Sequence, residues 1–334
     1  MIRSSQCAKS LLALALAAAG FAAQAADKVT VQLKWVPQAQ FAGYYMAAAK
    51  GFYKDAGLDV TIKAGGPDIA PTQVIAGKQA DIVVDWMPSA LAAREAGVPL
   101  VNVAQIYNRS GLMLTCNKSS GIKSPKDFKG KTLGVWYGGN EYPLFNWLAK
   151  LGYNKDTDVK IIKQAFNVDA LLQKQADCIS TMIYNEYWQI MDAGVKEKSL
   201  MPFYYEDQGV AVLEDGLYVL EANLKDPAFV ARMGKFLKAT LKGWDAAVKD
   251  PEAAAKAVVA ADTSGSASVK VQKRQMENVA KLITNAGTKK IGYLEPAAYE
   301  RTVKVLLAGG SDPVIKKDPG KAAYSHAIWE AAQK

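Results

Sequence analysis

Short apolar runs rich in β-branched residues alternate along the chain with segments of helical length that close on glycines. The clearest unit has an apolar strand at 29–33, an Ala-rich helix at 38–50 and another strand after Gly57. Regular alternation of this kind predicts an α/β fold of mainly parallel sheets covered by helices. Further helices are expected at 71–76, 88–96, 143–151, 169–175 and 186–193, and further strands at 81–84, 100–106, 132–135, 159–162 and 178–183.

The pattern changes after Gly216, where longer helices replace the strand and helix alternation. Two of them are expected to open at Asp226-Pro227 and Asp250-Pro251, because an Asp cap followed by Pro suits the first helical turn. A third is expected near Pro296. These helices are interpreted as packing elements.

Residues 1–25 have the pattern of a secretory signal. Arg3 and Lys9 precede the apolar run 11–21, and the segment ends in Ala-Gln-Ala. Cleavage is expected after Ala25, which predicts an exported, periplasmic protein. Cys7 lies upstream of the apolar run, where it cannot serve as a lipid anchor. No later stretch approaches the ~20 apolar residues of a membrane span.

Composition narrows the function classes. The chain has 50% hydrophobic and 22% charged residues with a net charge of +9, but its lysines are scattered. A nucleic-acid partner would need a clustered basic stripe, so none is expected. The single histidine, His326, and the absence of a Cys/His grouping predict no metal or cofactor. Cys116 and Cys178 remain after cleavage, and their pairing is left open.

Candidate ligand-binding residues follow the predicted strands, at the edge where α/β sheets bind small molecules. They are mainly aromatic, amide-bearing or acidic, and the glycines among them allow close backbone approach. The set is Trp35, Gln38, Gln40, Tyr44, Asp85, Trp86, Tyr107, Trp136, Tyr137, Gly138, Gly139, Asn140, Glu141, Tyr184, Asn185 and Glu186. Stacking on the aromatic rings at ~0.5 to 1.5 kcal/mol per pair favours a flat ligand.

The candidate acids Asp85, Glu141 and Glu186 argue against an anionic ligand. A carboxylate facing an anion at about 4 Å costs ~4 kcal/mol at an effective dielectric of 20. The same groups accept hydrogen bonds from amino groups. As alternatives, the aromatic residues are ordinary packing, and Glu141 and Glu186 are first-turn acids of helices. Arg109 would readmit anions unless an acid pairs with it.

Several motifs carry a family resemblance: residues 33–45 (LKWVPQAQFAGYY), 49–60 (AKGFYKDAGLDV), 77–82 (GKQADI), 128–135 (FKGKTLGV) and 184–186 (YNE). The chain resembles solute-binding proteins of ABC importers from the nitrate/sulfonate/thiamine-pyrimidine group, and among them the thiamine pyrimidine precursor binders most. The Gly-Lys-Thr at 130–132 is no P-loop, because the required upstream glycine is missing.

The resemblance implies a type II periplasmic-binding-protein fold with two βα lobes, a two-strand hinge and a ligand cleft between the lobes. Residues 26–112 would form the first part of lobe 1, residues 113–211 lobe 2, and residues 212–334 the return to lobe 1. The hinge crossings are expected near 111–116 and 208–216. Such a receptor closes on its ligand because only the closed form contacts it from both lobes.

The expected function is capture of a small planar amino-heterocycle, a formylaminopyrimidine or hydroxymethylpyrimidine, by a monomer that delivers it to permease subunits in the inner membrane. Riboflavin and sulfonate, taurine or nitrate are the alternatives. A fungal pyrimidine synthase that shares the fold uses its own histidine and a cysteine-rich stretch. The chain departs from that enzyme, since His326 lies near the C-terminus and Cys116 has no neighbouring cysteine. No enzymatic activity is expected.

Overall fold

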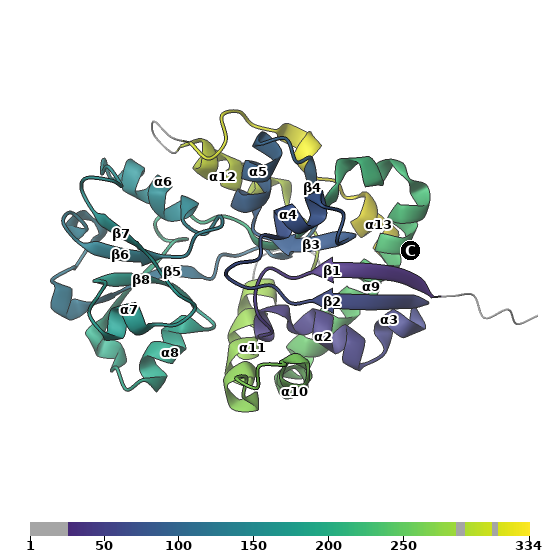
Figure 1. The fold of residues 1–334 in the computed structure, drawn as a ribbon, viewed down its shortest axis with the longest axis horizontal. Helices are drawn as coiled ribbons and strands as arrows, with labels where there is room; N and C mark the ends of the chain where they lie inside the picture. The colour runs from purple at the N-terminus through teal and green to yellow at the C-terminus, as the bar shows by residue number, and fades with distance from the viewer. Residues whose placement is uncertain (1–25, 285–290, 309–312) are drawn as a thin grey trace, which may run out of the picture.

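A computed structural model describes residues 26–284, 291–308 and 313–334. The predicted signal segment, residues 1–25, lies outside this range. Two separate five-stranded sheets, each flanked by helices, form the framework (Figure 1). We call the parts built on them the first-sheet half and the second-sheet half. No helix in the described ranges has the length and apolarity to cross a membrane.

The first sheet has the order β2-β1-β3-β10-β4. Its strands are β1 (Asp27–Gln32), β2 (Leu58–Lys63), β3 (Ile82–Asp85), β4 (Leu100–Tyr107) and β10 (Glu214–Leu220). Strand β1 pairs in parallel with β2 and β3, whereas β10 runs antiparallel to both β3 and β4. This sheet is therefore mixed.

The second sheet repeats the arrangement in the order β7-β6-β8-β5-β9. It contains β5 (Leu112–Asn117), β6 (Thr132–Val135), β7 (Lys160–Lys163), β8 (Cys178–Met182) and β9 (Leu200–Tyr204). Strand β6 is parallel to β7 and β8, and β5 is antiparallel to β8 and β9. Four of the five strands in each sheet run in the same direction, which confirms the prediction of mainly parallel sheets, and the reversed strands are β10 and β5. Apolar patterning reports burial but not strand direction.

Helices connect and cover these strands. The first-sheet half has η1 (Ala39–Phe41), α2 (Ala42–Ala49), α3 (Phe52–Asp55), α4 (Pro71–Ala76) and α5 (Met87–Glu95). The second-sheet half has η2 (Lys118–Ser120), η3 (Pro125–Asp127), α6 (Tyr142–Lys150), α7 (Asp169–Leu172), α8 (Glu186–Asp192) and η4 (Glu197–Ser199). The chain then continues with η5 (Glu221–Lys225), α9 (Pro227–Lys249), α10 (Pro251–Ala261), α11 (Val269–Thr284), α12 (Pro296–Leu307), η6 (Gly320–Ala323) and α13 (Ala327–Gln333).

The predicted helix caps after Gly216 are confirmed. The Asp226 side chain accepts a hydrogen bond from Ala228 N at 2.9 Å, and Asp250 accepts one from Ala253 N at 2.9 Å. Helix α9 packs tightly on α2: a Cβ added at Gly43 would overlap the Trp244 ring. This contact fixes α2, the helix that directly follows the loop carrying Trp35 and Gln38.

The chain passes between the two sheets twice. It leaves the first sheet after Tyr107 and enters the second at Leu112, and it returns between Tyr204 and Glu214. The buried Glu214 carboxylate joins the two crossings, because it accepts hydrogen bonds from Ser110 Oγ at 2.5 Å and Gly111 N at 3.0 Å. Burial raises the pKa of Glu214 to about 8.

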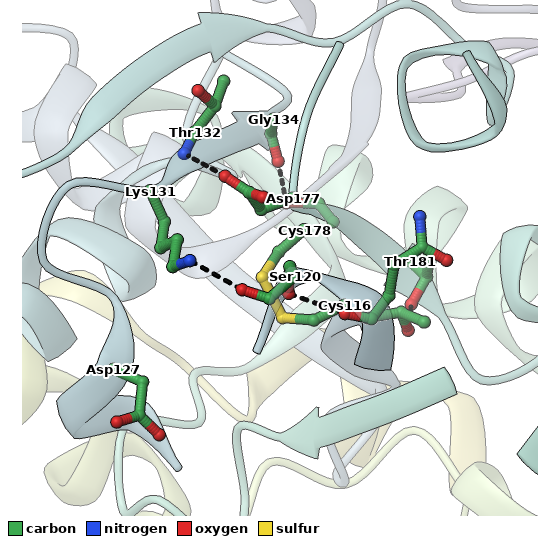
Figure 2. Close-up of a disulfide and its surroundings, with 12 residues drawn as sticks. Cys116, Ser120, Asp127, Lys131, Thr132, Gly134, Asp177, Cys178 and Thr181 are labelled. Carbon is green, nitrogen blue, oxygen red and sulfur yellow. Dashed lines mark hydrogen bonds between the residues drawn. A yellow bond between two sulfur atoms is a disulfide. The ribbon is translucent and has the colours of Figure 1, made fainter. Parts of the chain in front are cut away.

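A disulfide links Cys116 of β5 to Cys178 of β8, which the sequence had left open (Figure 2). The two residues are direct partners in the antiparallel ladder. Both are completely buried, and the adjacent hydroxyls of Thr115 and Thr181 lie 2.6 Å apart. The bond therefore fastens the central strand pair of the second sheet.

Candidate functional site

A narrow pocket lies between the two halves at the carboxyl ends of their strands. Its lining comes from both sides: Lys34, Trp35, Gln38, Gln40 and Trp86 from the first-sheet half, and Trp136, Asn140, Met182, Tyr184 and Glu186 from the second-sheet half. The pocket has a volume of about 30 Å³ and adjoins an outer groove of about 480 Å³ that shares four of these residues. Strand-end positions far apart in the sequence therefore converge on one site.

Three indoles line the pocket, and each one follows a strand. Trp35 comes after β1, Trp86 directly after β3, and Trp136 directly after β6. The Trp136 Nε1 donates to Ala165 O at 2.9 Å, which fixes that ring on its loop. Because both halves contribute indoles, the pocket can hold a flat ring from two sides.

Glu186 supplies the acid in the pocket lining. It is the first residue of α8, is 3% exposed, and accepts hydrogen bonds from Met182 N at 2.9 Å and Asn185 Nδ2 at 2.7 Å. Burial raises its pKa to about 7. When it is ionised, a carboxyl that is desolvated but still faces the pocket can accept a hydrogen bond from an amino group, and a protonated ring nitrogen can balance its charge.

Asp85 has a different environment from the one expected at a strand end that faces ligand. Its carboxylate is fully buried, lies 2.7 Å from Lys34 Nζ, and accepts from Trp86 N and Ser89 Oγ. The pocket lining contains Lys34 but not Asp85. Asp85 therefore balances the charge of Lys34 and does not itself face the pocket.

Glu141 is used to shape a loop. Its Oε2 accepts from Gly139 N at 2.8 Å, and it makes no side-chain cap on α6. Burial raises its pKa. Gly138 and Gly139 have φ values of 86° and 105°, in the left-handed region that favours glycine. The loop reaches the first-sheet half, where Gly138 O accepts from Lys34 Nζ at 3.2 Å.

The remaining candidates surround the pocket without lining it. Tyr44 and Tyr107 pack behind it in the core, each edge-on to Trp244, and the Tyr107 hydroxyl donates to Gln40 O at 3.0 Å. Tyr137 is 48% exposed and lines the outer groove. Asn185 donates from Nδ2 to Gln38 Oε1 at 3.2 Å and thereby connects the two halves.

Sequence reasoning missed Lys34, Met182 and the buried Asp215 of β10. Lys34 belongs to the same loop as Trp35 but was not counted as a site residue, and Met182 is the last residue of β8. Asp215 accepts from Gln40 Nε2 at 2.7 Å, and burial raises its pKa to about 7. The sequence feature that could have revealed Asp215 is the pair of acids, Glu214 and Asp215, within an apolar strand.

Arg109 does not reach the pocket. Its guanidinium pairs with Glu206, the Nη2 to Oε2 distance being 2.6 Å, and thereby joins the two crossings. Glu206 is thus the acid that pairs with this cation.

Within the described ranges, Asn140 Oδ1 and the Tyr184 hydroxyl are among the lining atoms that are buried without a hydrogen-bond partner. Their residues are 7% and 1% exposed. Buried polar atoms in proteins are almost always paired, so unpaired ones in a pocket mark positions suited to ligand contacts. The pocket therefore combines apolar walls with a few convergent polar groups, as small-molecule sites do.

The fold defines a class of protein. Over 93% of this chain and 95% of the other, the structure is similar to a sulfonate-binding protein of an ABC transporter from Methylobacillus flagellatus, with a TM-score of 0.62 and 16% identity. The chain thus has the periplasmic-binding-protein fold, and the order 2-1-3-10-4 of its first sheet confirms the expected type II topology. Residues 38–254 match the NMT1/THI5-like family model, and the chain belongs to this family.

Relatives by sequence carry different names. The chain is 27% identical over 240 residues to a formylaminopyrimidine-binding protein from Halalkalibacterium halodurans, covering 69% of each chain. It is 25% identical to a riboflavin-binding protein from Chloroflexus aurantiacus, over 68% of this chain and 64% of that protein, less than two thirds of its length. Over 109 residues, 32% of each chain, it is 30% identical to a yeast 4-amino-5-hydroxymethyl-2-methylpyrimidine phosphate synthase.

Proposed function

We propose that the protein is the exported ligand-capturing component of an ABC importer, and that its ligand is a thiamine pyrimidine precursor of the formylaminopyrimidine or hydroxymethylpyrimidine type. The observation that carries the proposal is the pocket itself, where indoles from both halves flank a buried carboxyl, that of Glu186. An aminopyrimidine offers a flat ring for the indoles and a donor for the acid. The formylaminopyrimidine-binding relative supports the same ligand class.

The size of the pocket favours a single ring. The inner space of about 30 Å³ would have to widen for any ligand, and less for a pyrimidine than for the three fused rings of a flavin. Widening requires the two halves to separate around the crossings near Ser110 and Glu214. We propose that the two halves act as lobes and that the receptor works as a monomer. In its closed form it delivers the ligand to a permease in the inner membrane.

The charges of the residues around the pocket favour a pyrimidine over a sulfonate as the ligand. Among the described residues that line the inner pocket, Lys34 is the one cation, and Asp85 already pairs with it at 2.7 Å. An anion would therefore compete with Asp85 for the lysine and face Glu186 as well. Both effects lower its affinity.

Binding without catalysis is part of the proposal. The histidine of the chain, His326, contacts Leu294 O at 3.0 Å and stacks on Tyr293, away from the pocket lining. Cys116 and Cys178 are joined in a disulfide. Within the described ranges, no cluster of three or more His, Cys, Asp or Glu residues could hold a metal. The pocket thus offers recognition groups but no histidine or thiol.

Calorimetric titration tests the ligand. Purified protein, unfolded and refolded to remove any carried ligand, is titrated with 4-amino-5-hydroxymethyl-2-methylpyrimidine, its formylaminopyrimidine relative, riboflavin and taurine. We expect the pyrimidines to bind at least about tenfold more tightly than the others. Tighter binding of riboflavin or taurine would replace the proposed ligand, and turnover of a bound pyrimidine would contradict the binding-only function.

A further inference from the structure

A chain of three side-chain amides runs from the core of the first-sheet half to the second-sheet half. Gln40 Nε2 donates to Asp215 Oδ2 at 2.7 Å, and Gln38 Nε2 donates to Gln40 Oε1 at 2.6 Å. Asn185 Nδ2 then donates to Gln38 Oε1 at 3.2 Å. All four side chains are at least nine-tenths buried. We call this series the amide chain.

The direction of the amide chain follows from the group at its inner end. Above its pKa of about 7 the Asp215 carboxyl is mainly ionised and can only accept hydrogen bonds, so Gln40 turns its NH₂ toward Asp215 and its oxygen outward. That oxygen in turn requires the NH₂ of Gln38, whose own oxygen then faces Asn185. An amide without such a neighbour could adopt either orientation.

The outer end of the amide chain lies beside the acid of the pocket. Asn185 Nδ2 donates both to Gln38 Oε1 and to Glu186 Oε1, at 3.2 and 2.7 Å. Gln38 and Glu186 both line the pocket, and their oxygens gather around the same nitrogen. Each oxygen keeps a second lone pair for a ligand. The two therefore form a pair of acceptors contributed by opposite halves.

We propose that Asp215 is a specificity-determining positioning residue: through Gln40 it orients Gln38, and the resulting acceptor pair selects ligands that present an amino group. This inference rests on the proposed function for the identity of the ligand. Asp215 is not among the lining residues; it reaches the pocket through the amide chain and through its side-chain contact with Trp86. Without its carboxylate, Gln40 and Gln38 could reverse and present NH₂ groups to the ligand.

The backbone at Asp215 is compatible with such a role. Its φ of 34° lies in the left-handed region, which side chains other than Asp and Asn rarely adopt. Asp215→Asn therefore removes the charge without adding backbone strain. The neighbouring Glu214 offers a matched control, because it is equally buried and ionisable but bonds to the crossing at Ser110, Gly111 and Leu112 instead of the amide chain.

The experiment measures selectivity. Wild type, Asp215→Asn and Glu214→Gln are titrated with 4-amino-5-hydroxymethyl-2-methylpyrimidine and with the analogue whose amino group is replaced by a carbonyl. Wild type should prefer the amino compound by about tenfold or more, and Asp215→Asn should reduce the preference to about threefold or less. Glu214→Gln should keep the wild-type ratio. Equal weakening of both compounds by Asp215→Asn, or an equal change of ratio in Glu214→Gln, would overturn the proposal.

A ligand-free measurement keeps this test separate from the proposed function. In ¹⁵N spectra, the side-chain NH₂ resonances of Gln38 and Gln40, assigned by removing each residue, should both move in Asp215→Asn and remain in place in Glu214→Gln. Movement of Gln40 alone would show that orientation is not passed on to Gln38 and would overturn the inference. If wild type binds neither pyrimidine, the proposed ligand is wrong, and these resonances alone decide the role of Asp215.

Discussion

Lys34 and Asp85 form a buried ion pair at the edge of the pocket, with 2.7 Å between Nζ and Oδ1 and with Asp85 fully buried. The lysine also lies 5.8 Å from the centroid of the Trp86 ring and donates to Gly138 O of the other half. The pair thus connects a wall of the pocket to the loop that faces it.

Asp85→Asn should destabilise the protein by about 3 to 5 kcal/mol, because it leaves the buried Lys34 charge without its counterion. Urea unfolding followed by tryptophan fluorescence measures the loss. Replacing both residues by Lys34→Met and Asp85→Leu should recover much of it, since the uncompensated charge is then gone. An Asp85→Asn variant as stable as wild type would show that the pair is not energetically coupled.

Glu186→Gln should weaken binding of an aminopyrimidine by about 1.5 to 3 kcal/mol, the value of a hydrogen bond to a charged group. Glu141→Gln is the informative comparison, because Glu141 is also buried but bonds to Gly139 N instead of lining the pocket. Calorimetry should show a smaller loss for that variant. Unchanged affinity in Glu186→Gln would return Glu186 to the role of a first-turn helix acid.

Local signals in the sequence were sufficient to predict where many helices and strands lie. Helix α4 spans Pro71–Ala76 as predicted, because Pro marks its first turn and Gly77 follows its end. Helix α7 ends at Leu172, before the predicted residue 175, and Lys174 has a φ of 58° that no sequence signal announced. Helix α11, Val269–Thr284, was missed because no Asp-Pro pair opens it.

The candidate site shows the same limit: local features were predicted from the sequence, and features that depend on contacts between distant segments were not. Strand-end position alone found Trp35, Trp86 and Trp136, since the order of strands and loops is readable locally. It could not tell Glu186, which lines the pocket, from Asp85, which pairs with Lys34, because that difference depends on contacts between distant segments. Asp215 was missed for the same reason: its partner, Gln40, is 175 residues away.

Stability should fall as the pH rises from about 4.5 to about 8. The folded-state pKa is raised by burial to about 7 for Glu186 and Asp215 and to about 8 for Glu214, above the ordinary value of 3.8 to 4.5. The folded protein therefore holds more protons than the unfolded chain in this window, which makes the slope negative. Each of the three carboxyls contributes on the order of a few kcal/mol to this change.

Urea unfolding at half-unit pH steps measures this slope. Glu214→Gln should flatten it most between about pH 7 and 8, where the other two carboxyls are already more than half ionised. Asp59→Asn, at an exposed position of β2, should leave the slope as in wild type. A slope that is flat or positive in wild type would show that these carboxyls are not protonated in the folded state.

Reduction of the Cys116–Cys178 bond should cost about 2 to 4 kcal/mol of stability, because the bond closes a long loop in the unfolded chain. Its partners are 62 residues apart. Unfolding with and without dithiothreitol measures the effect. The double variant Cys116→Ala/Cys178→Ala should not respond to the reductant, and a similar response in that variant would assign the effect to something other than this disulfide.

Gly139→Ala should prevent the two halves from closing fully. A Cβ at this position would lie 2.7 Å from Ser89 Cβ and 3.1 Å from Ser89 N, on helix α5 of the opposite half. Closure would have to stop short of this contact, so ligand affinity should fall by about tenfold or more. Small-angle scattering should show a smaller decrease in radius on ligand addition than in wild type.

Gly138→Ala separates this clash from backbone strain. Gly138 has a φ of 86°, close to the 105° of Gly139, but an added Cβ there would meet nothing within 4 Å. Both variants carry strain of about 1 kcal/mol, whereas only Gly139→Ala introduces a contact between the halves. If the two variants bind ligand equally well, the loop does not limit closure, and the approach of Gly139 to Ser89 has no part in binding.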